Sequence, residues 1–137
     1  MAIIVLDGGI QNQLNVLINN GGNKLDTYKA RLYTNNHTPV HTDAIGAFTE
    51  AAWAGYTSQT LSPWGAASVS ASVASSLGPV VVFNNTSGGS VNTYGYFATD
   101  AGNTTAYFAE LFAGAPISIP TGLGLSLQIT FQEQSIN

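Results

Sequence analysis

The sequence contains no cysteine. Disulfide bonds, thiolate zinc sites and catalytic thiols are therefore excluded together. With 137 residues, of which 45% are apolar, the chain is long enough to bury the core of one domain without cross-links. Its stability has to come from packing, strand pairing or assembly with other chains.

The sequence also contains few charged residues. Asp, Glu, Lys and Arg make up 7% of the chain, against about 25% in an ordinary globular protein. Three cations and a net charge of -4 cannot follow a phosphate backbone or hold an anionic bilayer, so we expect neither nucleic acid nor membrane as a partner. A surface so poor in charge suits a protein that packs against other chains. The alternative is a monomeric β domain with a surface of Ser, Thr and Asn.

Long apolar runs are missing as well. The run Ile3–Leu6 is too short for the apolar part of a signal peptide, and Asp7 follows it directly. No later segment approaches the ~20 apolar residues of a membrane-spanning helix. We expect a soluble protein.

One short helix is predicted near the N-terminus. Within Gly9–Asn20, apolar residues recur at helical spacing and form one stripe. Asp7 is placed to cap the helix, and Gly21-Gly22 is placed to end it. The apolar stripe consists of Ile10, Leu14, Leu17 and Ile18.

The rest of the chain reads as β structure. Short β-favouring runs alternate with clusters of Gly, Pro, Asn and Ser. Because no strand–helix–strand rhythm occurs, we expect a mainly β, antiparallel β-sandwich of the jelly-roll or Ig-like sort. It forms a single domain over residues 1–137, with an arm and helix over 1–22 and a β core over 23–137. The predicted strands are Tyr28–Thr34, Ala66–Ala74, Pro79–Asn84, Thr93–Thr99, Thr105–Phe112, Ile117–Ile119 and Leu123–Phe131, with Ile3–Leu6 as a further candidate.

Three of these runs carry specific expectations. Leu123–Phe131 alternates five apolar residues with small or polar ones, which predicts a half-buried strand. Ser68–Val73 alternates small residues and favours a sheet edge. The continuous apolar run Pro79–Phe83 predicts a strand that is covered on both faces.

Few residues offer catalytic or metal chemistry. His37 and His41 lie near Asp43 and Glu50, a set that could supply metal ligands. The surrounding segment is rich in turn residues, so an ordinary solvated loop is the favoured interpretation and no metal is expected. The sequence has no G-x-S-x-G elbow and no phosphate-binding loop. We therefore expect neither an enzyme nor a cofactor.

Glu110 is an unusual acid. In a strand it shares a face with Phe108 and Phe112. It is therefore either partnered or located at a subunit boundary. Neither position indicates catalysis, because no second acid follows at a fixed spacing.

Aromatic residues and cations supply the candidate contacts. Flat aromatic side chains stack on sugars, anchor protein interfaces or fill the core, and general burial tendencies favour the core. All three cations fall within eight positions. They either form a contact to an acidic surface of a protein shell or are scattered charges on an exposed strand. The candidate contact residues are Lys24, Lys29, Arg31, Trp53, Tyr56 and Trp64, with Tyr94 and Tyr96 as further aromatics.

A set of motifs resembles a family of small structural proteins of tailed phages. The family shares an L-Y-T-N-x-x-T-P opening, an F-T-E-A then G-Y segment, a G-Y-[FY] strand, and a closing P-x-x-I-P-x-G-x-x-L-x-L stretch. The corresponding segments here are Leu32–Pro39, Phe48–Ala51 with Gly55-Tyr56, Gly95–Phe97 and Pro116–Leu127.

The resemblance implies a place in the virion, in the capsid or the tail, and transfers no catalytic residue. Jelly-roll-like cement proteins that sit as oligomers on phage heads are one known use of such domains. We expect a capsid decoration protein, made in the host cytoplasm, that binds the major capsid protein and itself, as a homotrimer. The alternative is a tail-fibre or head-fibre module that binds a host surface glycan.

Overall fold

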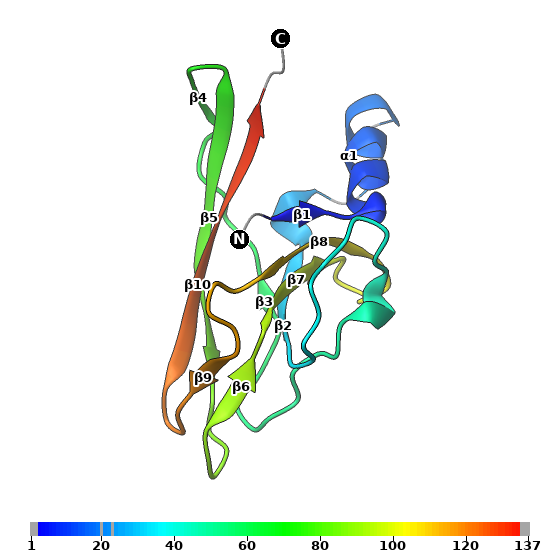
Figure 1. Cartoon of the computed structure of the whole chain (residues 1–137). Helices are drawn as coiled ribbons and strands as arrows, with labels where there is room; N and C mark the ends of the chain where they lie inside the picture. The colour runs from blue at the N-terminus through cyan, green and yellow to red at the C-terminus, as the bar shows by residue number, and fades with distance from the viewer. Residues whose placement is uncertain (1–2, 20, 23, 135–137) are drawn as a thin grey trace.

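A computed structural model describes residues 3–19, 21–22 and 24–134 of the chain. The fold is mainly β, with one N-terminal α-helix and three antiparallel sheets (Figure 1). The elements are β1 (Ile4–Val5), α1 (Asp7–Asn19), η1 (Leu25–Thr27), β2 (Lys29–Tyr33), η2 (Ile45–Ala47), β3 (Gln59–Thr60), β4 (Ser68–Ser70), β5 (Val73–Asn84), β6 (Val91–Thr93), β7 (Gly95–Thr99), β8 (Ala106–Leu111), β9 (Ile117–Ile119) and β10 (Gly124–Gln134).

The five-stranded sheet, with the order β1-β8-β7-β2-β3, is covered on both faces. Side chains alternate between the two faces. Tyr96 shares one face with its cross-strand neighbours Leu32 and Glu110, and Phe97 points to the other face. One face contributes to a cluster shared with the three-stranded sheet, which we call the inter-sheet cluster. Its large members include Leu32, Phe83, Tyr96, Phe108 and Ile129. The opposite face forms a second cluster that includes Leu6, Tyr33, Phe48, Phe97 and Ala109.

The three-stranded sheet, with the order β10-β5-β4, is dominated by the long antiparallel pair β5 and β10. Leu125, Leu127, Ile129 and Phe131 all pack on the inter-sheet cluster, so the predicted half-buried strand is confirmed for these residues. Leu123 is an exception, because it lies before β10 and is exposed.

Two predictions about β5 are wrong. Within Pro79–Phe83, Val81 and Phe83 are buried but Val80 and Val82 are exposed, so the strand is covered on one face only. The run Ala66–Ala74 is not one strand either, because Ala71 and Ser72 have positive φ values of 48° and 66° and turn the chain between β4 and β5. Alternating small residues give no sequence signal for such a turn, since Gly or Asn usually marks it. β4 does lie at the sheet edge, as predicted.

The remaining strands follow the sequence pattern with small shifts. Of the predicted run Thr93–Thr99, Thr93 is the last residue of β6 and Gly95–Thr99 forms β7, and the two strands belong to different sheets. The short strand β3 was not predicted. Within the described part of the chain, no helix is long and apolar enough to cross a membrane.

The helix forms where the sequence predicts, and its apolar stripe faces away from the rest of the protein. Gly9 and Asn12 are buried, whereas the apolar side chains of Ile10, Leu14 and Ile18 are exposed. The side chain of Leu17 and the expected last residue, Asn20, lie outside the described residues. Gly22, with φ 76°, follows the helix and fits the predicted stop.

Candidate functional site

The three cations do not form one surface patch. Lys24 is exposed, and Lys29 donates a hydrogen bond from Nζ to Thr60 Oγ1 at 2.6 Å. Arg31 is only 9% exposed. Its guanidinium donates to Glu50 Oε1 at 2.8 Å and to Thr99 Oγ1 at 2.9 Å. In the isolated chain, Arg31 is therefore an internal ion-pair partner.

The Arg31–Glu50 pair is part of a network that also holds Tyr56. The Tyr56 hydroxyl donates to Glu50 Oε1 at 2.9 Å and accepts a bond from the Leu32 backbone N–H at 3.2 Å. Burial, followed by the negative charge of Glu50, raises the pKa of the Tyr56 hydroxyl. The network fastens the loop that carries Glu50 and Tyr56 onto β2.

The candidate aromatic residues pack at the margin of the inter-sheet cluster. Trp53 donates from Nε1 to the Asn84 carbonyl at 3.0 Å and meets Tyr56 edge to face. The Tyr56 ring stacks on Phe83, with centroids 5.9 Å apart. Trp64, which is half-buried, lies against Gly78. These side chains close the edge of the core, and the structure does not align them as one open platform.

The other two aromatics lie on opposite faces of the five-stranded sheet. Tyr94 is half-buried and packs against the second cluster, whereas Tyr96 is buried within the inter-sheet cluster.

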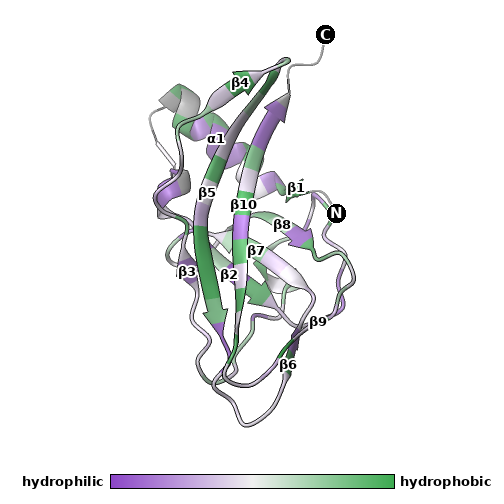
Figure 2. Cartoon of the chain, turned by 90° about the vertical axis from the view of Figure 1, so that its left-hand side faces the viewer, coloured by the Kyte–Doolittle hydropathy of each residue, from purple (hydrophilic) through white to green (hydrophobic). Residues whose placement is uncertain are grey.

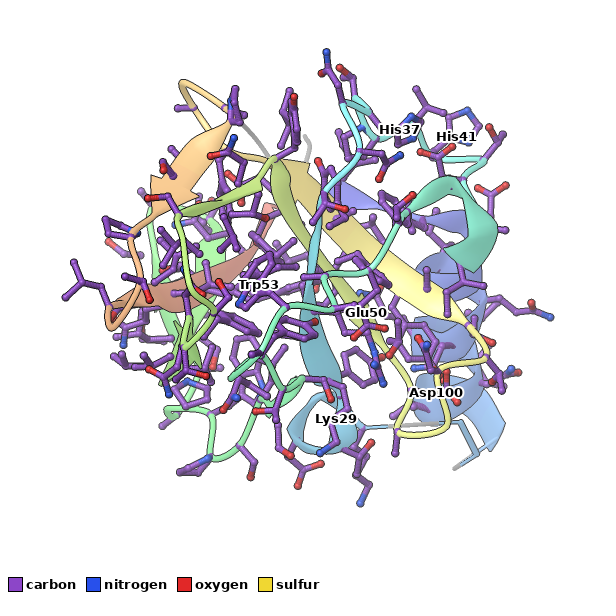
Figure 3. The ribbon with its side chains drawn as sticks, turned by 90° about the horizontal axis from the view of Figure 1, so that it is seen from below. Lys29, His37, His41, Glu50, Trp53 and Asp100 are labelled. Carbon is purple, nitrogen blue, oxygen red and sulfur yellow. The ribbon has the colours of Figure 1, made fainter. Side chains whose placement is uncertain are left out.

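The two histidines are held by different carboxylates. His37 Nε2 lies 2.6 Å from Asp43 Oδ2, and His41 Nδ1 lies 3.2 Å from Asp7 Oδ1. Glu50, the fourth member of the candidate set, belongs to the Arg31 network instead, and Figure 3 shows it well away from both histidines. Among the residues that the structure describes, no three His, Asp or Glu side chains gather in a way that could hold a metal ion.

Glu110 faces an open cavity of about 430 Å³ between β10 and the five-stranded sheet. Its Oε2 accepts a hydrogen bond from the Tyr96 hydroxyl at 2.9 Å. Burial, followed by the charge of Glu110, raises the pKa of that hydroxyl. Of the two positions that the sequence allows for Glu110, the structure shows the partnered one. The cavity is lined by Ile3, Tyr96, Glu110, Leu127, Gln128, Ile129, Thr130 and Gln132.

The outer face of the three-stranded sheet is apolar and exposed, and we call it the sheet patch. Leu77, Val80 and Val82 are 49%, 60% and 39% exposed. Their partners across the β5–β10 pair are the uncharged residues Thr130, Gln128 and Ser126. β4, β5 and β10 have 3, 12 and 11 residues, and Glu133 is their one ionisable side chain. The sheet is seen face on in Figure 2, where the lower half of β5 is green.

A second exposed apolar surface lies on α1, and we call it the helix stripe. Ile10, Leu14 and Ile18 are 53%, 56% and 66% exposed. They are four residues apart and share one side of the helix. The sequence shows both surfaces as apolar patterns, and it predicts wrongly that the run Pro79–Phe83 is covered on both faces. Low charge content was the one signal that pointed to exposed apolar area.

Comparison with protein-family models, curated proteins and solved structures gives no match for the chain.

Proposed function

We propose that this protein is a virion structural protein of a tailed phage, a capsid decoration or cement protein that stabilises the head by binding neighbouring capsid subunits. The observation that carries the proposal is the pair of exposed, uncharged apolar surfaces, the sheet patch and the helix stripe. Contiguous exposed apolar surface on a small protein is typical of sites that other chains cover. Protein interfaces are likewise depleted of charge at their centres.

The surface charge supports the same conclusion. Of three cations in the chain, Arg31 is buried in an ion pair. Lys24 and Lys29 are the other two cations, so few charged side chains surround the exposed apolar surfaces of a free monomer. Covering the apolar surfaces in an assembly removes this difficulty.

The proposed fold is a β-sandwich of the jelly-roll or Ig-like sort. Its support is the inter-sheet cluster, to which both the five-stranded and the three-stranded sheet contribute. In the proposed assembly, homotrimers sit on the outside of the head and contact the major capsid protein. The protein acts by added interface area and requires no catalysis, cofactor, nucleic acid or membrane.

Copy number in purified virions tests this function. A decoration protein is present at a level comparable to that of the major capsid protein, which quantitative mass spectrometry measures. Replacing Val80 and Val82 with Asp should reduce occupancy strongly, whereas Ser90→Asp, in the exposed loop before β6, should leave it unchanged. A chain that is missing from purified particles would refute the proposal.

The alternative, a fibre module that binds a host glycan, draws its support from the cavity beside β10. Its polar lining of Glu110, Gln128, Thr130 and Gln132 could bind sugar hydroxyl groups. A fibre would be present in few copies per particle and would bind glycans on an array. Loss of glycan binding in Glu110→Gln, at a low copy number, would favour this alternative over decoration.

A further inference from the structure

The cavity that holds Glu110 opens along the free edge of β10. In the order β10-β5-β4, β5 pairs with one side of β10, and no described strand pairs with the other. Figure 2 shows β5 and β4 to the left of β10 and no strand of this sheet to its right. Four consecutive residues, 127 to 130, line the cavity, although successive side chains face opposite sides of a strand. None of the described lining residues belongs to β5, so the cavity lies beside the backbone of β10 on its unpaired side.

This edge of β10 is able to pair with a further strand. In an antiparallel pair, alternate residues direct their N–H and C=O groups to the partner, and the others direct theirs outward. Sheet edges that avoid pairing usually carry lysine, proline or a bulge. β10 contains no lysine or proline, and its one charged residue is Glu133, near the end. The register shift in the β5–β10 pair places the extra residue in β5, between Leu77 and Val80, and leaves β10 regular.

Glu110 gives the cavity a negative charge that no ion pair balances in the described structure. The Tyr96 hydroxyl donates to Oε2 at 2.9 Å, and a carboxylate has the capacity to accept several more hydrogen bonds. No lysine or arginine is among the described residues that line the cavity. In such a partly enclosed site, an opposite charge is attracted more strongly than in open water. A neutral sugar would satisfy the hydrogen bonds of this carboxylate but not its charge, so the observations favour a cation.

We propose that the cavity binds an extended, basic segment of a partner chain, which adds a strand to the free edge of β10 and places one Lys or Arg side chain against Glu110. This inference rests on the proposed function, in which the segment belongs to a neighbouring capsid subunit. Main-chain hydrogen bonds along the edge supply affinity, and the cavity supplies the preference for a cation. Ile3, Leu127 and Ile129 provide an apolar wall for the aliphatic part of the same side chain.

Short peptides test the site, with nuclear magnetic resonance spectra of the full chain as the readout. The probe is a capped heptapeptide in which Val, Arg and Val alternate with Thr, and its control carries citrulline, the uncharged isostere of arginine. The Arg peptide should bind at least about tenfold more tightly, because the charge strengthens its hydrogen bond to the carboxylate. The amide signals that change should be those of β10 and of Glu110. Equal affinity for the two peptides would overturn the proposal.

Substitution of Glu110 tests the role of its charge. Glu110→Gln keeps the shape of the side chain and should abolish the preference for the Arg peptide. The matched control is Glu133→Gln, which lies on β10 but not among the residues that line the cavity, and it should retain the preference. A preference that survives in Glu110→Gln would contradict the proposal. The comparison of Arg with citrulline uses the unaltered chain, so it stands even if a variant fails to fold.

Methylation of the peptide backbone tests the pairing with β10. Methyl groups on alternate amides block the hydrogen bonds of one edge of an extended peptide. Of two Arg peptides methylated along opposite edges, one should lose binding and the other should keep it. Equal binding of both would overturn the proposal, as would an ethylguanidinium ion that binds as tightly as the Arg peptide, because either result would place a free cation in the cavity. Neutral sugars that bind on a glycan array and are lost in Glu110→Gln would assign the cavity to a glycan instead.

Peptide binding and particle occupancy separate this inference from the proposed function. A chain that prefers the Arg peptide but is missing from purified particles refutes the decoration role only. A chain that occupies particles but shows no preference for the Arg peptide refutes the role of the cavity only.

Discussion

The five-stranded and the three-stranded sheets differ in how they meet solvent. Every residue of β7, in the five-stranded sheet, is buried, because core clusters cover both of its faces. β5, in the three-stranded sheet, has one covered face, and its other face exposes Leu77, Val80 and Val82. Both strands are rich in apolar residues. The difference shows that the layers around a strand, and not its own composition, decide whether it is buried.

The same contrast appears in the ionisable side chains. Tyr28, Tyr33, Tyr56 and Tyr96 all belong to the five-stranded sheet or pack against it, and burial raises the pKa of each hydroxyl. The three-stranded sheet has no tyrosine and only Glu133 as an acid. The five-stranded sheet therefore carries the internal polar contacts, and the three-stranded sheet carries the surface available for contact. Four experiments test this division.

Alkaline pH should destabilise the protein through the tyrosines of the five-stranded sheet, and this is the largest expected effect. Burial raises the pKa of Tyr28 and of Tyr33 from 10.0 to about 12. Between these values the unfolded chain has already lost protons that the folded chain keeps, so stability falls as the pH rises. We expect stability to be unaffected by these groups below about pH 10 and to be lost cooperatively as the pH approaches 12. Circular dichroism followed together with phenolate absorbance measures this. Ionisation of all six tyrosines near pH 10 while the fold persists would contradict the prediction.

Removing a large side chain from each sheet should give unequal costs. Phe97 is buried in the second cluster, and Phe97→Ala should lower the free energy of unfolding by about 3–5 kcal/mol. Val80 lies on the sheet patch, and Val80→Ala should change it by no more than about 0.5 kcal/mol. Urea denaturation at low protein concentration, where self-association does not contribute, measures both. Equal costs would show that the outer face of β5 is packed within the monomer.

Two glutamates extend the comparison to charge. Glu50→Ala leaves the buried Arg31 guanidinium without its carboxylate and should cost about 1–3 kcal/mol. Glu133→Ala, in the exposed end of β10, should change stability by about 0.5 kcal/mol or less. Thermal and urea unfolding of both variants provide the measurement. If the two substitutions cost the same, the Arg31–Glu50 pair contributes no more than an exposed charge.

The smallest expected effect concerns the contact between α1 and the rest of the protein. Asn12→Ala removes the hydrogen bond to the Tyr28 hydroxyl and should cost about 1 kcal/mol. Gln13→Ala, one position further along and exposed, is the matched control and should be near neutral. Hydrogen exchange of the α1 amides should increase in Asn12→Ala only. Unchanged exchange would mean that the contact of Gly9 with β8 alone fixes the helix.

Sequence reasoning located most elements but misjudged how β5 is covered. The runs that became β2, β8 and β9 were found because their β-favouring residues are bounded by turn residues. The apolar stripe of α1 correctly indicated a helix, but its buried side is set by Gly9 and Asn12, whose roles depend on the β8 backbone and on Tyr28. The turn at Ala71 was missed because neither it nor Ser72 is a residue that favours positive φ.

The candidate site residues show the same limit. Lys24, Lys29 and Arg31 are close in sequence, which allows either one shared contact or scattered cations on an exposed strand. The strand β2 instead directs Arg31 to Glu50, nineteen positions away, and Lys29 to Thr60. Such pairings depend on the loop that returns over the sheet, which no local pattern in the sequence specifies.

The sequence by itself determined the properties that are sums over residues or short-range patterns: the lack of thiol chemistry, the low charge, the N-terminal helix, and the alternation of β10. The tertiary structure alone decided which apolar faces are covered and which cations and aromatics are free. The physical reason is that burial is a relation between elements. A side chain leaves water only when another layer of the chain lies over it, and in this fold such a layer covers both faces of β7 but only one face of β5 and one side of α1.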